Sequence, residues 1–105
     1  MYLPEKYKSF AADYPEISKV YKEMGTLARK SGPLDEKTQN LVKLGIAVGS
    51  NSRGAVMSHT RKALDTGAGK EEINHVVMLA LTTTGFPNMI AALSWVREVL
   101  EKDGK

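Results

Sequence analysis

The side chain best suited to proton transfer in this sequence is His59. His59 is three or four residues from Val56, Ala55 and Ala63, and seven residues, or two helical turns, from Ser52. It therefore falls on the inward stripe of a predicted helix. An imidazole with a pKa of about 6.5 exchanges protons near neutral pH and can act as a general acid or base. The alternative is a structural histidine that bonds a backbone carbonyl or a hydroxyl such as that of Ser52.

Sulfur and metal chemistry are not indicated by the composition. The 105 residues contain no cysteine, which removes thiol nucleophiles, disulfides, cysteine-ligated zinc and iron–sulfur clusters. Ala55 and Ala63 stand one helical turn to either side of His59, and the other histidine, His75, lies on a different predicted helix. The sequence also has no glycine-rich phosphate loop. We therefore expect neither a metal ion nor a cofactor.

Positive charge is concentrated around the histidine. Between residues 37 and 64 the sequence has no acidic side chain and five basic ones, which are Lys37, Lys43, Arg53, Arg61 and Lys62. Such a region attracts and orients a small anion, and the alternative is a solvated helix face. The formal net charge is only +3, and no basic patch alternates with aromatic residues, so we do not expect a nucleic-acid partner.

The elements that position these residues are predicted to be helices. No segment alternates with period two, whereas apolar residues recur three and four apart over about 15–30, 35–49, 52–66, 70–81 and 89–100. The second of these segments is apolar nearly all round, which is typical of a central buried helix. Asp35 is a predicted N-cap, and Gly67 and Gly69 punctuate the chain between the third and fourth helices. The sequence indicates an all-α bundle of about five to six helices.

The chain is expected to fold as a single domain with three parts. Residues 1–33 form an N-terminal aromatic arm and the first long helix, 34–100 form the helical core, and 101–105 form a polar tail. Five of the seven aromatic residues belong to the arm, which is expected to clamp on the body or on a neighbour: Tyr2, Tyr7, Phe10, Tyr14 and Tyr21. The first residues lack the pattern of a signal peptide, and no apolar run reaches the ~20 residues that a bilayer needs. We expect a cytoplasmic protein without a membrane partner.

A long uncharged stretch predicts self-association. No formally charged residue occurs from Ile73 to Val96, and a chain of this length cannot enclose two whole helices in its own core. Burial against another copy of the chain accounts for such a helix pair, so we expect a homo-oligomer. The alternative is a monomer with a neutral, threonine-rich face.

Several motifs in a fixed order connect the sequence to a known family. They are the Leu34–Thr38 segment, the Ser58–Leu64 segment with its His-Thr-Arg-x-Ala-Leu phrase, the Gly67–Ile73 segment and the Gly85-Phe86-Pro87 turn. Over residues 34–100 the chain resembles the carboxymuconolactone decarboxylase family, which includes the alkylhydroperoxidase D-like proteins. The resemblance implies an all-helical fold that assembles as a trimer or hexamer.

One branch of that family uses thiols. Its two cysteines, its histidine and its relay glutamate correspond here to Ser52, Ala55, His59 and Asn40, so only the histidine is retained. A hydroxyl cannot cycle through a disulfide, and an amide cannot exchange a proton as a carboxylate does. A thiol-dependent alkylhydroperoxidase or peroxiredoxin-type activity is therefore disfavoured.

The decarboxylase branch lacks the cysteine pair and retains the histidine. The resemblance implies a carboxy-lyase that removes CO2 from a small carboxylated lactone or a similar anion, with His59 as the general acid or base. Ser52 is the second implied catalytic residue, while Asn51, Arg53 and Lys43 are implied to bind the anionic substrate. The alternative function is a non-catalytic oligomeric binding or accessory protein.

Overall fold

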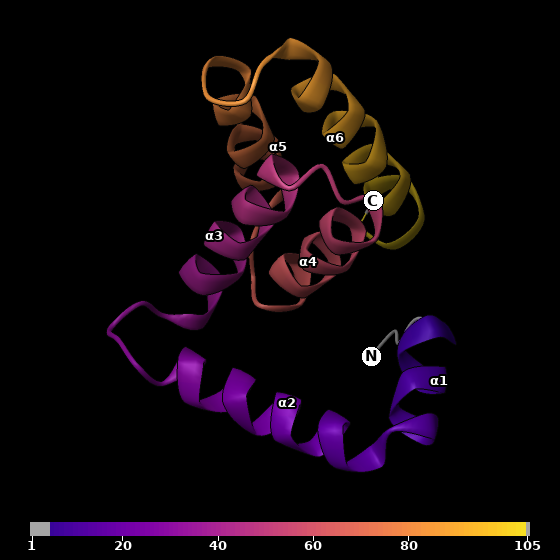
Figure 1. The fold of residues 1–105 in the computed structure, drawn as a ribbon. Helices are drawn as coiled ribbons and strands as arrows, with labels where there is room; N and C mark the ends of the chain where they lie inside the picture. The colour runs from indigo at the N-terminus through magenta and orange to yellow at the C-terminus, as the bar shows by residue number, and fades with distance from the viewer. Residues whose placement is uncertain (1–4, 105) are drawn as a thin grey trace. The chain divides into compact units, whose positions relative to one another are not determined.

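The computed structural model describes residues 5–104, with side chains as far as Lys102. In this range the chain forms six α-helices and no strand, which confirms the all-α prediction (Figure 1). The helices are α1 (Glu5–Asp13), α2 (Pro15–Arg29), α3 (Glu36–Gly49), α4 (Arg53–Asp65), α5 (Lys70–Leu79) and α6 (Phe86–Val99). A 3-10 turn, Ala80–Thr82, follows α5, and a π-helical turn, Leu100–Gly104, follows α6. Tyr2 of the predicted arm and the final residue of the predicted tail, Lys105, lie outside the described residues.

The chain divides into two compact units, Met1–Pro33 and Leu34–Lys105. In the first unit, α1 occupies most of the segment that the sequence indicated only as an aromatic arm. The Phe10 and Tyr14 rings lie 5.7 Å apart between centroids, and Lys22 Nζ lies 5.8 Å from the centre of the Tyr7 ring. The only buried side chain of α1 and α2 is that of Ser18, so these two helices bury no apolar side chain of their own.

The second unit contains the hydrophobic core. Thirteen buried apolar residues from α3 to the turn after α6 make one cluster, among them Leu44, Val48, Val56, Ile73 and Val96, all fully buried. Helices α3 and α4 run antiparallel. A hydrogen bond from Asn40, near the start of α3, to Thr66, just beyond the end of α4, shows their relative direction. This pair carries the residues that the sequence indicated as a site.

Helix α3 was predicted to be buried on nearly all sides, but one of its faces is exposed. Leu44, Ala47 and Val48 are buried, but Val42 is 47% exposed and Ile46 is 64% exposed. The reason is that the other helices of the unit cover only part of the circumference of α3. Its remaining apolar face is left uncovered within one copy of the chain.

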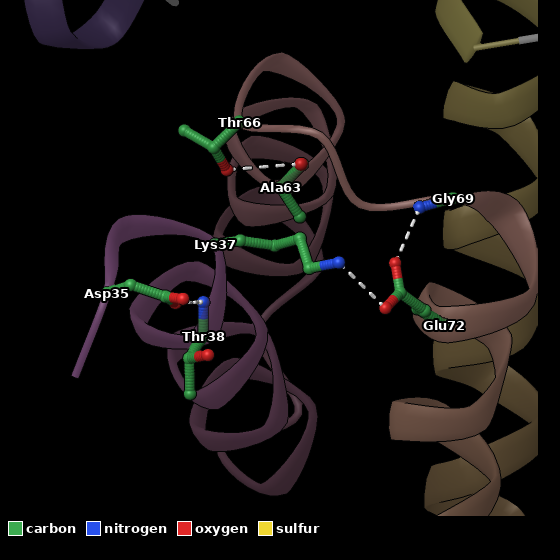
Figure 2. A network of polar contacts seen from close by, with 7 residues as sticks. All are labelled: Asp35, Lys37, Thr38, Ala63, Thr66, Gly69 and Glu72. Carbon is green, nitrogen blue, oxygen red and sulfur yellow. Dashed lines mark hydrogen bonds and ion pairs between the residues drawn. The ribbon is translucent and has the colours of Figure 1, made fainter.

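The start of α3 is fixed by an aspartate cap. Asp35 accepts a hydrogen bond from the backbone N–H of Thr38 at 2.8 Å, as the sequence predicted. The hydrogen bond from Thr38 lowers the pKa of the Asp35 carboxyl, because it stabilises the ionised form. Figure 2 shows this cap beside the contacts that join α3 to α5.

A short network joins the start of α3 to the start of α5. Lys37 Nζ lies 3.0 Å from one carboxylate oxygen of Glu72, and the other oxygen accepts from the backbone N–H of Gly69 at 2.9 Å (Figure 2). The Gly69 hydrogen bond and, after it, Lys37 lower the pKa of Glu72. Glu72 therefore caps α5 from its third position and bridges to α3 at the same time.

Asn88 on α6 holds the turn between α3 and α4. Its side-chain amide donates to the carbonyl of Val48 at 2.7 Å and to Asn51 Oδ1 at 3.2 Å, while its own Oδ1 accepts from the Thr84 hydroxyl. Asn51 has a φ of 54°, in the left-handed region that side-chain-bearing residues seldom adopt. The amide therefore stabilises a strained turn immediately before α4.

Helix α6 begins at Phe86, earlier than the apolar periodicity from Met89 indicates. Gly85, with a φ of 101°, supplies the turn, and Pro87 fits the first turn of a helix because its missing N–H has no intrahelical partner there. The Gly-Phe-Pro sequence thus starts the helix rather than lying in front of it.

The substitution Gly69→Ser is expected to stabilise the protein. Gly69 has φ −90° and ψ 167°, and a Cβ there would meet nothing within 4 Å, so a serine fits and completes a capping box with Glu72. The expected gain in unfolding free energy is a few tenths of a kcal/mol. The matched control is Gly67→Ala, which is expected to cost about 1 kcal/mol because φ at Gly67 is +100°. Urea unfolding of both variants checks the pair, and a destabilised Gly69→Ser variant contradicts the assignment.

The substitution Asn88→Asp is expected to destabilise the second unit. It removes the amide donor and places a carboxylate against two acceptor oxygens, which costs about 1–3 kcal/mol. The control is Asn51→Gly, which keeps the bond from Asn88 to Val48 and suits the positive φ. Thermal unfolding should separate the two variants, with the glycine variant close to the wild type. If both variants lose the same amount of stability, the hydrogen bond from Asn88 to the Val48 carbonyl contributes little to it.

Candidate functional site

The candidate site is centred on His59 in the middle of α4, near Lys43 in the middle of α3. His59 is half-buried there, and its Nδ1 is buried without a hydrogen-bond partner among the described residues. A buried ring nitrogen that stays unpaired costs about 1–3 kcal/mol, so this position favours a bound water or ligand. The structure thus gives His59 no hydrogen bond at Nδ1 of the kind that a purely structural histidine would make.

Ser52 does not supply that bond. Its hydroxyl oxygen accepts from the backbone N–H of Ala55 at 3.3 Å and caps the first turn of α4. Ser52 and His59 share a face of the helix but stand two turns apart, about 10 Å along the axis. A ligand smaller than this reaches only one of the two side chains.

The electrostatics of the site keep His59 neutral. Burial lowers the pKa of His59 below its ordinary value of 6.5, and the positive charges of Lys62 and Lys43 lower it further. Lys43 comes from α3 and Lys62 from α4, so the cations approach the imidazole from two helices. At neutral pH the ring carries one proton and keeps one nitrogen as an acceptor.

Asn40 connects the two helices next to this site. Its side-chain amide donates to the Thr66 hydroxyl at 3.0 Å and to the Lys62 carbonyl at 3.4 Å. These bonds fix the end of α4, whose last turn carries Lys62, against the first half of α3, one turn before Lys43. Asn40 therefore holds the end of α4 against α3.

The other residues indicated by the sequence lie apart from His59. Arg53 Nη2 is 2.7 Å from a carboxylate oxygen of Glu98 on α6, so this guanidinium is engaged in an ion pair. Asn51 lies in the turn before α4 and accepts from Asn88. Of the predicted site residues, the structure therefore brings together His59 and Lys43.

Lys62 is a site residue that the sequence analysis did not single out. It was counted in the basic run, but it stands three residues after His59, which is a neighbouring position on a helix. This spacing could have identified Lys62 as a neighbour of His59 from the sequence alone. Arg53 was predicted from the basic run and from the family resemblance, neither of which determines the direction of a side chain.

The described part of the chain has neither a cluster of metal-binding side chains nor a helix suited to cross a bilayer. Residues 5–102 contain no group of three or more His, Asp or Glu side chains arranged to hold a metal ion. None of the helices between residues 5 and 104 combines the length and apolar character that crossing a bilayer requires.

The sequence matches the model of the carboxymuconolactone decarboxylase family over residues 15–98. The chain belongs to this family. The match covers the whole α3–α4 pair and extends back through α2, beyond the 34–100 range in which the motifs lie. The predicted resemblance is confirmed.

Two individual proteins are similar to part of this chain. An uncharacterised protein of Methanocaldococcus jannaschii is 36% identical over 66 residues, which are 63% of this chain and 62% of that protein. The nitrosuccinic acid decarboxylase of Metarhizium robertsii is 33% identical over 69 residues, 66% of this chain and 48% of the enzyme. The chain therefore spans less than two thirds of the length of both proteins.

A solved structure reproduces the fold. The crystal structure of a carboxymuconolactone decarboxylase family protein from Legionella pneumophila, in its apo form, superposes with a TM-score of 0.83 at 25% sequence identity. The alignment covers 95% of this chain and 88% of that protein.

The lowered pKa of His59 predicts a pH-dependent loss of stability. Below about pH 6.5 the unfolded chain takes up a proton at this residue while the folded chain does not, so folding is weakened as the pH falls toward the folded pKa. The substitution His59→Gln should remove this component, so the stability of the wild type relative to the variant should fall between pH 7.5 and 5. Denaturant unfolding across this range measures the difference.

The control for this experiment is His75→Gln, since His75 is exposed on α5. If this variant removes as much of the pH dependence as His59→Gln does, burial of His59 is not its cause.

Proposed function

We propose that the protein is a carboxy-lyase that removes CO2 from a small carboxylated lactone or a similar carboxylate, with His59 as its proton-transfer group. The observation that carries the proposal is the buried Nδ1 of His59, which has no partner among the described residues and lies within reach of the charges of Lys43 and Lys62. Membership of the family supports the reaction class, as does the similarity to a nitrosuccinic acid decarboxylase.

Decarboxylation has two steps at such a site, cleavage of a carbon–carbon bond and protonation of the carbanion that forms. The bond between the carboxylate carbon and its neighbour breaks, and the electron pair stays on the neighbour as an enolate or similar carbanion. A proton must then reach that carbon, so the overall change consumes one carboxylate and one proton and yields CO2 and the protonated product. A positioned imidazole can deliver the proton.

The charges around His59 suit an anionic substrate. Lys43 and Lys62 attract a carboxylate to the same place where they hold the pKa of His59 down. A bound anion offsets their charge and raises the pKa of the imidazole, so the ring takes up a proton as substrate binds. The proton is then available when the carbanion forms.

The remaining predicted residues have smaller roles in the proposed reaction. Arg53 would have to leave Glu98 before it could bind substrate. Ser52 lies about 10 Å along the helix from His59, so it meets only the far end of an elongated substrate. The assembly proposed for the chain is the trimer or hexamer that the family resemblance implies.

A substrate screen tests the proposal. Carboxylated lactones and small dicarboxylates, including nitrosuccinate, are ranked by thermal shift, and the compounds that stabilise the protein are then assayed for CO2 release and for the decarboxylated product. We expect turnover that falls by about 10²–10⁴-fold in His59→Gln, which is the usual contribution of a general acid or base. The variant His75→Gln should retain the activity.

Two outcomes contradict the proposal in different ways. Stabilisation by carboxylates without product would favour the alternative of a non-catalytic binding protein. Product formation that is unchanged in His59→Gln would leave the reaction class but remove the role of His59.

A further inference from the structure

A polar pocket of about 590 Å³ lies between the beginning of α5 and the end of α6. Its lining residues are Lys70 and Asn74 from α5, Arg97 from α6, and Leu100 and Glu101 from the turn that follows α6. None of them belongs to α3 or α4, the helices that carry His59 and its two lysines. The pocket is therefore separate from the site of the proposed reaction, and its volume is in the range of small-molecule sites.

Helical spacing groups the polar residues of this pocket into two pairs. Asn74 stands four residues after Lys70, and Glu101 stands four residues after Arg97. Residues four apart lie on the same face of a helix, about one turn from each other. Because both pairs line one pocket, the α5 pair faces the other pair across it, with Leu100 as a buried apolar residue beside them.

Asn74 brings an unsatisfied acceptor to the pocket. The side-chain oxygen Oδ1 is buried and has no hydrogen-bond partner among the described residues. An unpaired buried acceptor costs free energy, so its position favours a ligand or water with an N–H or O–H group. The amide turns about the single bond between Cβ and Cγ, which lets this oxygen meet a donor in the pocket.

The charged side chains of the pocket are exposed and make no ion pair among the described residues. Lys70 and Arg97 are positive and Glu101 is negative, and each of them lacks a partner of opposite charge in the described part of the chain. The pocket therefore offers two cations, one carboxylate and one amide oxygen to the same ligand.

This set of groups complements a ligand with two carboxylates and one ammonium group. We propose that the pocket binds a small acidic amino acid, whose carboxylates pair with Lys70 and Arg97 and whose ammonium donates to Glu101 and Asn74 Oδ1. A dicarboxylate without an amine brings no cation to Glu101 and no N–H to Asn74, and a diamine meets two like charges. The inference goes beyond the proposed decarboxylation and does not depend on it.

NMR of the full-length protein labelled with ¹⁵N locates the binding site directly. L-aspartate and L-glutamate are the probes, and succinate is the matched analogue of aspartate without its amine. We expect at least one of the two amino acids to cause saturable shifts of the backbone N–H signals of Leu100 and Glu101. Succinate should need at least about tenfold higher concentration, because it lacks the charged donor.

Two variants test the partners of the ligand. Asn74→Leu is close in shape and removes the unsatisfied acceptor, so its thermal stability should equal or exceed that of the wild type. Arg97→Gln removes an exposed charge. Each variant should weaken binding of the amino acid by at least about tenfold, as expected for a lost hydrogen bond to a charged group. The control is Lys102→Gln, an exposed cation on the same turn that does not line the pocket, and it should keep the wild-type affinity.

Several results would overturn the inference. They are the absence of shifts at Leu100 and Glu101 with millimolar amino acid, equal affinity for succinate at these signals, and wild-type affinity in both Asn74→Leu and Arg97→Gln. Shifts confined to the surroundings of His59 would also overturn it, because they would place the ligand at the site of the proposed reaction. Since no CO2 release is measured, failure of the proposed decarboxylation is a separate outcome.

Discussion

The antiparallel packing of α3 against α4 is the constraint on which the rest of the structure depends. Both helices contribute small or branched side chains to the core, with Ala47 and Val48 from α3 and Val56 and Ala63 from α4 almost fully buried. Small side chains let two helices approach closely. Because the helices run in opposite directions, Asn40 near the start of α3 meets Thr66 just beyond the end of α4, and Lys43 in the middle of α3 comes near His59 in the middle of α4.

This packing produces an electrostatic arrangement that favours an anion. Removing the imidazole from water disfavours its charged form, and the two lysines strengthen that effect. Both effects favour the neutral ring, and its Nδ1 has no hydrogen-bond partner among the described residues. Under the proposed function, a carboxylate bound beside the lysines would offset their charge, so that ligand binding and proton uptake would be coupled.

Much of the fold follows from local sequence patterns, and less of the site does. Asp35, Ser52, Gly67 and Gly69 end or begin helices as predicted, because caps depend on a few neighbouring residues. The sequence did not show that α3 leaves Val42 and Ile46 exposed, since that depends on which helices pack around it. Likewise His59 was found by its helical spacing, whereas the pairing of Arg53 with Glu98 joins residues far apart in the chain.

The account predicts that His59 is neutral when the site is empty and gains a proton when an anion binds. The most direct measurement is an NMR titration of the His59 imidazole from pH 8 to 5, without ligand and with saturating succinate as a probe anion. We expect a pKa below 6.5 in the free protein and a higher pKa with succinate bound. A pKa at or above 6.5 in the free protein, or one that bound succinate leaves unchanged, would contradict the account.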